Sequence, residues 1–433
     1  MTIKGWQLLG SLVLCLLAAC GQEVAPAKPP RSTVTFLHYF SDSLSGGVGE
    51  TAQAFNAQNT SHELKAVSLD HEAFKSSIRD TLQAGNPPDL YSNWAGARTA
   101  AIVDRLQPID DVWASAGLDA VFSPAVTQAA SEYAGHKYLL PLTQHYIGIF
   151  YNKRLFAEHG LQPPASWDEF LAVCERLKAA GVTPIALGAR DKWPAQFWFD
   201  FLLLRSVPYE FRQRLMNGEA RFDDPRVLAV FARWKRLLDA GYFNRQPHPN
   251  SLAWDSGANE MVYRGEAAMT LMGTWNIGYF TNPAHGWEAG RDFDFFPFPV
   301  IDPQLPRVAM GPIDGLVLPR QAANPAGARA VLAYFAGAAA QQAFSRGSGA
   351  LAPNRQVPAS AYNELQQRVR DDIGRSPIFT FAFDLAAPPA VASLGLDAFA
   401  DFLAFPQSYP EIARQLAADA ATAFAARPGK VVQ

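Results

Sequence analysis

The sequence predicts an α/β fold, from a repeated order of elements and from local capping signals. Between residues 34 and 91, apolar segments typical of strands alternate with segments typical of helices, as expected for a parallel α/β sheet. Hydrophobic residues make up 49% of the 433 residues, enough for a large core in two or three domains. No internal repeat or long low-complexity segment competes with this plan.

The first elements follow from apolar runs and glycine stops. Residues 34–36 open a strand, and residues 64–67 form a second one. Residues 49–56 are the first expected helix, and residues 71–85 are a second helix that ends at a glycine. Residues 86–91 then turn into a third strand, which completes the alternation.

The stretch at 147–170 has the clearest helix punctuation in the chain. An apolar strand at 147–151 leads into a short helix that ends at Gly160, a residue able to adopt the left-handed stop conformation. Ser166 caps a new helix, and Glu169 three residues later completes a capping box. This order again predicts an α/β domain.

Several of these segments resemble one protein family. The Tyr-Asn-Lys-Arg-Leu-Phe run that starts at residue 151, with its later Pro-Pro and Ser-Trp-Asp-Glu, resembles the YNK…F…G…PP-TW-E segment of bacterial extracellular solute-binding proteins, which feed sugars to ABC transporters. Residues 85–90 resemble the family's G-x-P-P-D-hydrophobic element, and residues 261–275 its F-x-x-G-x-A-A-M-x-x-x-G-x-W block. Later matches extend the resemblance over essentially the whole mature chain: 294–299, 311–319 and 342–349.

The resemblance implies a two-lobe, periplasmic-binding-protein-like α/β fold with hinge strands and a ligand cleft between the lobes. The expected parts are lobe one at 33–141 plus 300–340 and lobe two at 142–299 plus 341–433. The hinge strands are expected at 141–146 and 298–301.

The N-terminus independently predicts export and anchoring. Lys4 precedes an apolar core at 8–19, which has signal-peptide length and is shorter than the roughly 20 residues of a membrane span. Leu-Ala-Ala-Cys, ending at Cys20, resembles a bacterial lipoprotein cleavage site. That resemblance implies a signal peptide at 1–19, lipidation of Cys20 and a lipidated tether at 20–32, whereas an ordinary signal peptide with an incidental cysteine is the alternative. We therefore expect an extracytoplasmic protein, in the periplasm or at the cell surface, lipid-anchored to the membrane.

Charge and missing motifs exclude other function classes. The formal net charge is -3, or -4 once residues 1–19 and their single Lys4 are removed, which does not fit a nucleic-acid binder. Phosphate-cradling, zinc-spaced, calcium-loop and nucleophile-elbow motifs are absent from the sequence. We expect no cofactor, no metal and no catalytic residue.

A sugar presents apolar C–H faces that stack on aromatic rings and hydroxyls that need donors and acceptors. Candidates for such contacts are therefore aromatic and polar residues at strand ends and in loops, where ligands of α/β sheets bind. The expected ligand-binding residues are His38, Tyr39, Asp42, Trp94, Arg98, Gln144, His145, Trp193, Trp275 and Asp314.

Some of these candidates have a competing interpretation. Trp275 matches a family position that supplies a stacking tryptophan, but a core tryptophan is the alternative. Asp42 is either a hydroxyl acceptor or a helix N-cap or turn residue. His145 stands where maltose-type relatives carry an acidic contact, which puts maltose specificity in doubt.

The resemblance implies a sugar-binding lipoprotein, not an enzyme. It would capture a carbohydrate between its lobes and deliver it, as a monomer, to ABC transporter permease subunits that work with a separate ATPase. The alternative is a carbohydrate-active hydrolase on the cell surface, which would need two facing carboxylates.

Overall fold

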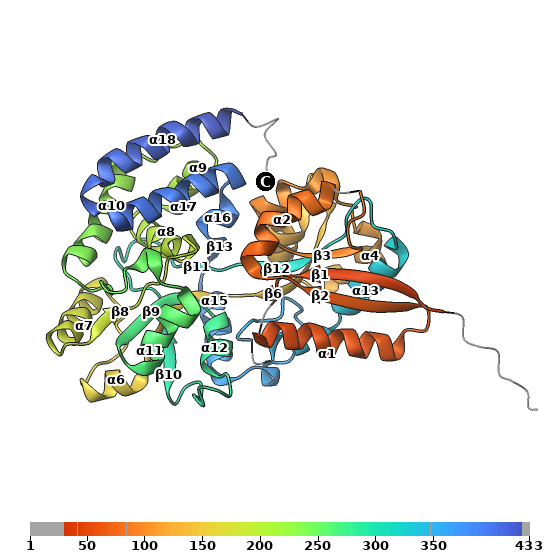
Figure 1. Cartoon of the computed structure of the whole chain (residues 1–433), viewed down its shortest axis with the longest axis horizontal. Coiled ribbons are helices and arrows are strands. Elements are labelled where there is room, and N and C mark those ends of the chain that lie inside the picture. The colour runs from red at the N-terminus through yellow and green to blue at the C-terminus, as the bar shows by residue number, and fades with distance from the viewer. Residues whose placement is uncertain (1–29, 41, 84, 347, 427–433) are drawn as a thin grey trace, which may run out of the picture.

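The computed structural model describes residues 30–40, 42–83, 85–346 and 348–426, which form two α/β lobes (Figure 1). Each lobe has its own sheet and its own hydrophobic core. The expected signal peptide and Cys20 lie outside the described residues. Within those ranges, no helix is long and apolar enough to cross a membrane.

Lobe one contains a five-stranded sheet in the order β2-β1-β3-β12-β6. Its strands are β1 (Ser32–His38), β2 (His62–Ser68), β3 (Leu90–Trp94), β6 (Leu139–Gln144) and β12 (Ile313–Val317). Its helices are α1 (Asp42–Gln58), α2 (His71–Gln83), α3 (Ala97–Ala100), α4 (Asp110–Ser115), α5 (Pro124–Val126), α13 (Pro325–Phe335) and α14 (Ala338–Ser345).

Lobe two contains a four-stranded sheet in the order β10-β7-β9-β8. Its strands are β7 (Ile147–Asn152), β8 (Thr183–Ile185), β9 (Ala267–Gly273) and β10 (Phe293–Phe296). Its helices are α6 (Lys153–Glu158), α7 (Trp167–Ala179), α8 (Gln196–Leu204), α9 (Tyr209–Met216), α10 (Pro225–Asp239), α11 (Glu260–Arg264), α12 (Trp275–Phe280), α15 (Glu364–Arg375), α16 (Phe383–Ala386), α17 (Pro389–Ala404) and α18 (Tyr409–Ala425). Two small two-stranded sheets pair β4 (Glu132–Tyr133) with β5 (His136–Lys137) and β11 (Val308–Met310) with β13 (Ile378–Thr380).

The three strands expected between residues 34 and 91 pair in parallel, so that prediction is confirmed, but strands from later in the chain make both main sheets mixed. β1 runs parallel to β2 and β3, but β12 runs antiparallel to β3 and β6, and β7 runs antiparallel to β9 and β10. The reason is that β12 and β7 each start where the chain enters a lobe from the other one, and therefore run away from the hinge. The C-terminal ends of β1, β3 and β9 consequently meet the start of β12 between the lobes.

The chain crosses between the lobes at 142–146, at 310–313 and at 344–351, as the two cores show. Backbone hydrogen bonds join these crossings: Gln144 N–H donates to Leu351 O (2.8 Å), and His145 N–H donates to Pro312 O (3.0 Å). The hinge strand expected at 298–301 is wrong, because Phe298 is buried in the core of lobe two.

Two predicted lobe boundaries also differ from the structure, as the core in which the residues pack shows. The strand β11, at residues 308–310, packs in the core of lobe two, although 300–340 was assigned to lobe one. Phe344 packs in the core of lobe one, although 341–433 was assigned to lobe two. The third crossing, implied by the predicted boundary between residues 340 and 341, lies slightly later in the chain, at 344–351.

The helix caps predicted from the sequence agree with the structure better than the lobe boundaries do. Ser166 Oγ accepts from Glu169 N–H (3.3 Å) and Glu169 Oε2 accepts from Ser166 N–H (3.0 Å), so the predicted capping box is confirmed. Gly160 has a φ of 62°, the predicted left-handed stop. By contrast, α1 begins at Asp42 and not at residue 49. Gly47 in its first turns lets the helix pack closely on α14, since a Cβ there would lie 2.9 Å from Phe344 Cα.

Candidate functional site

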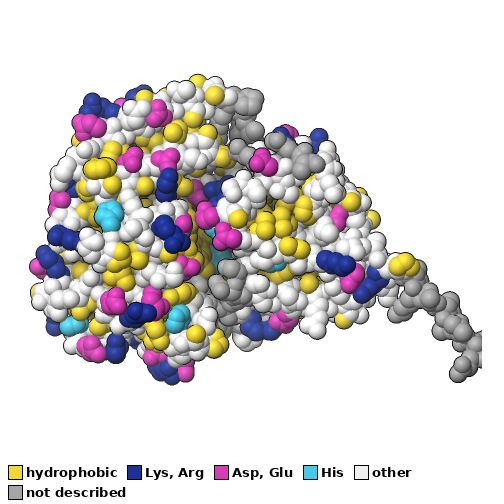
Figure 2. All heavy atoms as spheres, viewed as in Figure 1, with side chains coloured by type: hydrophobic (Ala, Val, Ile, Leu, Met, Phe, Trp, Pro, Cys, Tyr) yellow, Lys and Arg dark blue, Asp and Glu magenta, His cyan; other side chains and the backbone are white. Residues whose placement is uncertain are grey.

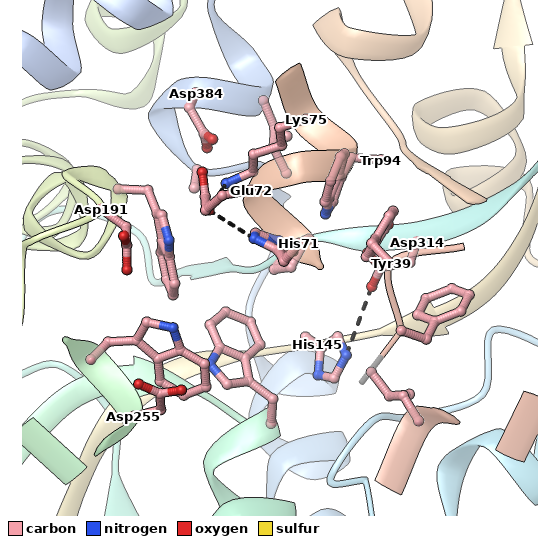
Figure 3. Close-up of a pocket in the computed structure, with 18 of the residues that line it drawn as sticks. Tyr39, His71, Glu72, Lys75, Trp94, His145, Asp191, Asp255, Asp314 and Asp384 are labelled. Carbon is pink, nitrogen blue, oxygen red and sulfur yellow. Dashed lines mark hydrogen bonds and ion pairs between the residues drawn. The ribbon is translucent and has the colours of Figure 1, made fainter. Parts of the chain in front are cut away.

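A cavity of about 650 Å³ lies between the two lobes and is lined by both. Figure 2 shows the corresponding hollow, with acidic, basic and histidine side chains gathered at its edge. In the close-up, Tyr39 and Trp94 stand on one side, Asp191 and Asp255 on the other, and His145 between them (Figure 3). The volume is within the range of small-molecule sites.

Lobe one contributes an aromatic wall from two neighbouring strands. Tyr39 follows β1 and Trp94 ends β3, and their rings stack with centroids 3.9 Å apart and planes 10° apart. Tyr39 Oη donates a 2.6 Å hydrogen bond to Asp314 Oδ1 at the start of β12. The parallel pairing of β1 with β3 aligns the two strand ends, which brings the rings together.

The hinge contributes a buried polar cluster. Asp314 Oδ2 accepts from Thr143 Oγ1 at 2.7 Å and lies 3.7 Å from His145 Nε2, and His145 Nδ1 lies 2.9 Å from Thr274 Oγ1. Burial raises the pKa of Asp314 to about 6, although the hydrogen bonds from Tyr39 and Thr143 oppose that rise. Burial lowers the pKa of His145 to about 3, so this imidazole is neutral at pH 7.

Lobe two contributes an indole wall. The ring centroid of Trp193 lies 5.8 Å from that of Trp254 and 5.9 Å from that of Trp275. The Trp275 ring lies against Gly273, where a Cβ would be closer than 3.0 Å to three of its ring atoms. Trp275 Nε1 is buried and has no acceptor among the described residues, so it is a donor that a ligand oxygen could satisfy.

A strained turn positions Trp193. Trp193 N–H donates a 2.7 Å hydrogen bond to Asp191 O, and Lys192 between them has φ 63° and ψ -44°. This is a γ-turn of the rare, strained form. Strain of this kind persists where the surroundings over-determine the conformation, often at ligand sites. Here it turns the chain so that Trp193 lines the cavity.

Charged side chains connect the lobes across the cavity. Asp384 of α16 accepts from Gln196 Nε2 (3.0 Å) in its own lobe and from Arg98 Nη2 (3.2 Å) of lobe one. Lys75 Nζ of α2 lies 5.7 Å from the ring centroids of both Trp94 and Trp193, which belong to different lobes. The lobes are therefore in contact around the cavity, not splayed apart.

Seven of the ten sequence-predicted ligand residues line the cavity: Tyr39, Trp94, Arg98, His145, Trp193, Trp275 and Asp314. His38 and Gln144 do not, and the side chain of Asp42 lies outside the described part of the structure. His38 lies on the same face of β1 as Phe36 and is buried against Phe36 and Phe40, with ring centroids 5.1 and 5.8 Å away. Asp42 begins α1, and the backbone of Gln144 is paired with Leu351.

The sequence interpretation missed a second set of lining residues. They include His71, Glu72 and Lys75 at the start of α2, Gln196 of α8, Trp254 and Asp255, Tyr279 of α12, and Asp384 of α16. The start of α2 had a usable signal, because it follows β2 at the same sheet edge as the ends of β1 and β3. Asp384 had no such signal in the sequence. It lies on α16, which the folding of the C-terminal segment brings to the cavity. No group of His, Cys, Asp or Glu within the described ranges is arranged to hold a metal ion.

Comparisons with known proteins agree with this architecture. Residues 42–342 match the family model described as "Bacterial extracellular solute-binding protein". An uncharacterized ABC transporter extracellular-binding protein of Pyrococcus horikoshii is 32% identical over 388 residues, which are 85% of this chain and 84% of that protein. A probable sugar-binding periplasmic protein of Mesorhizobium japonicum is 28% identical over 291 residues, 65% of this chain and 66% of that protein.

Among solved structures, the bacterial solute receptor AcbH is similar to this chain with a TM-score of 0.84 and 28% identity. The match covers 91% of this chain and 100% of AcbH, which is described as having an exclusive substrate preference for β-D-galactopyranose.

Proposed function

The chain belongs to the bacterial extracellular solute-binding proteins, and from that membership we propose that it captures a carbohydrate between its lobes and delivers it to the permease of an ABC transporter. The family consists of solute-binding receptors, so the chain acts by binding and not by catalysis. The relatives carry names of sugar-binding periplasmic and ABC transporter extracellular-binding proteins, which supports an extracytoplasmic location.

The observation that carries the proposal is the pairing of aromatic walls from both lobes around a polar band. Trp94 of lobe one and the indoles of Trp193 and Trp275 of lobe two offer flat apolar surfaces to the C–H faces of a sugar ring. Between them, Asp314 and Asp384 offer hydroxyl acceptors, and Trp275 Nε1 and Arg98 Nε are buried donors without an acceptor among the described residues. A buried polar group left unpaired costs about 1–3 kcal/mol, which a sugar hydroxyl would recover.

Capture would work by hinge closure around the three crossings. A ligand favours the closed form only if it contacts both lobes, since equal affinity for the open and closed forms shifts nothing. The Arg98–Asp384 hydrogen bond joins the lobes beside the cavity and would break on opening. In the closed form the sugar is enclosed, and the permease would bind the surface that the closed lobes present.

The anchor and the assembly state complete the proposal. Lipidation of Cys20 would tether the folded lobes to the membrane through residues 20–32, close to the permease. Stable anchoring needs more than one acyl chain, which a diacylglyceryl group in thioether linkage to the cysteine sulfur and an acyl chain on its amino group would provide. The binding unit would be a monomer that works with permease subunits and a separate ATPase.

A thermal-shift panel of neutral mono- and disaccharides, starting with D-galactose, tests the proposal on the chain from residue 30 onward. A ligand at a hundredfold excess over its Kd stabilises the folded state by about 2.7 kcal/mol, an easily measured rise in Tm. Mass spectrometry after long incubation should recover the bound sugar intact. A panel without any shift would overturn sugar capture, and hydrolysed sugar would favour a surface hydrolase.

A further inference from the structure

The charged side chains that line the cavity are unequal in number. Among the described residues, six carboxylates face three Lys and Arg side chains: Asp70, Glu72, Asp191, Asp255, Asp314 and Asp384 against Lys75, Arg98 and Arg190. His71 and His145 also line the cavity. Burial lowers the pKa of both below the ordinary value, so both imidazoles are neutral at pH 7. Neither histidine therefore adds positive charge at pH 7.

Each of the three cations already has a carboxylate partner. Lys75 Nζ donates to Glu72 Oε1 at 3.0 Å. Arg98 Nη2 donates to Asp384 Oδ2 at 3.2 Å. Arg190 Nε lies 3.5 Å from Asp191 Oδ1, at the exposed rim. An anionic ligand that took over either of the two bonds below the rim would leave Glu72 or Asp384 unpaired in a desolvated place. If it accepted only from the free Arg98 Nε, it would meet a guanidinium whose charge Asp384 already balances.

The other three carboxylates have no cationic partner among the described residues. Asp70 accepts two backbone N–H groups of α2, at 3.0 Å each. Asp255 accepts from the backbone N–H of Ser256 at 2.6 Å, and Asp314 accepts from two hydroxyls. These neutral N–H and O–H donors satisfy the hydrogen-bonding capacity of the carboxylate oxygens but do not balance their negative charge. The field inside the cavity therefore has an uncompensated negative sign, and low-dielectric walls strengthen it.

We propose that the cavity takes an uncharged carbohydrate and rejects anionic ones, such as uronates and sugar phosphates. The inference rests on the proposed function, since it assumes that the ligand is a sugar. A neutral hydroxyl can donate to the carboxylates and accept from Arg98 Nε and Trp275 Nε1 without breaking any of the three ion pairs. A carboxylate or phosphate can accept but cannot donate, so it meets Asp255 and Asp314 with repulsion and no hydrogen bond (Figure 3).

Sets of sugars matched at C6 test this selectivity. Isothermal titration calorimetry compares glucose, galactose, maltose, cellobiose and lactose with the same sugars oxidised at a C6 hydroxyl, and with the amides of those acids. The amide is neutral and close in shape to the carboxylate, so the acid-to-amide ratio of Kd isolates charge from size. We expect the acid to bind at least tenfold more weakly than its amide. A ratio below tenfold would overturn the inference.

Two variants identify the origin of the selectivity. Asp384→Asn leaves Arg98 without its carboxylate, and Glu72→Gln does the same for Lys75. Either substitution can also change lobe closure, but that change affects the Kd of the acid and of its amide equally and therefore cancels in the acid-to-amide ratio. At least one variant should lower the acid-to-amide ratio by threefold or more, and an unchanged ratio in both would refute the electrostatic explanation. Binding of acids alone would overturn this inference but leave sugar capture intact, whereas no binding by any member would overturn both.

Discussion

Gly273→Ala should weaken sugar binding although Gly273 itself has no side chain that contacts the ligand. Gly273 ends β9, and the ring of Trp275 lies against it. A Cβ at residue 273 would be closer than 3.0 Å to three ring atoms, while ordinary contact begins at 3.4 Å, so the ring must retreat by more than 0.4 Å. Backbone on the other side of the strand is hydrogen-bonded to β7, which makes the ring the easier part to move.

The expected loss follows from what the ring contributes. Aromatic stacking on a flat ligand is worth roughly 1–3 kcal/mol by analogy with base–aromatic stacking. Loss of that contact raises Kd by about 5- to 150-fold. Trp275→Ala should produce a loss of the same size, with the fold retained, since one face of this residue is turned to the cavity and not to the core.

A double-mutant cycle measured by calorimetry, with circular dichroism as the control for folding, decides the mechanism. If Gly273→Ala acts through the ring, it should cost almost nothing in the Trp275→Ala background, so that the two losses are strongly non-additive. Additive losses would refute the reasoning, because the glycine would then act through the strand. Full affinity together with a destabilised Trp275→Ala domain would assign Trp275 to the core.

The other predictions concern the anchor, the closure and a buried histidine. Cys20→Ser should abolish lipidation, which mass spectrometry of the mature N-terminus detects; an unmodified wild-type N-terminus that begins elsewhere would contradict the anchor. We expect the sugar to compact the protein in small-angle scattering, and Asp384→Asn should reduce that compaction because the Arg98–Asp384 bond joins the lobes. An equal compaction in the variant would contradict this role for the bond. Burial lowers the pKa of His38 to about 4, below its unfolded value near 6.5, so its neutral form is favoured in the fold and stability is lost as the pH falls from about 6.5 towards 4. His38→Phe should therefore gain about 2 kcal/mol at pH 5 relative to its effect at pH 8 in urea unfolding, and a difference that does not vary with pH would refute this assignment.

Much of the cavity was predictable because strand ends are marked in the sequence. Tyr39, Trp94 and Trp275 each stand at or just after an apolar strand, and ligands of α/β sheets bind at such ends. The same rule misplaced His38, because it does not say where the strand stops. His38 still belongs to β1 and follows the two-residue alternation into the core with Phe36.

The sequence by itself determined the α/β class, the capped helix α7 and the aromatic character of the site, since these depend on residues close together in the chain. Only the tertiary structure decided the direction of β12, the exact position of the third crossing and the contact between Arg98 and Asp384, which are 286 positions apart. Such contacts depend on how two lobes with separate cores meet at the hinge. No local sequence pattern predicts these contacts between the lobes, because the residues that stabilise them become neighbours only when both lobes have folded.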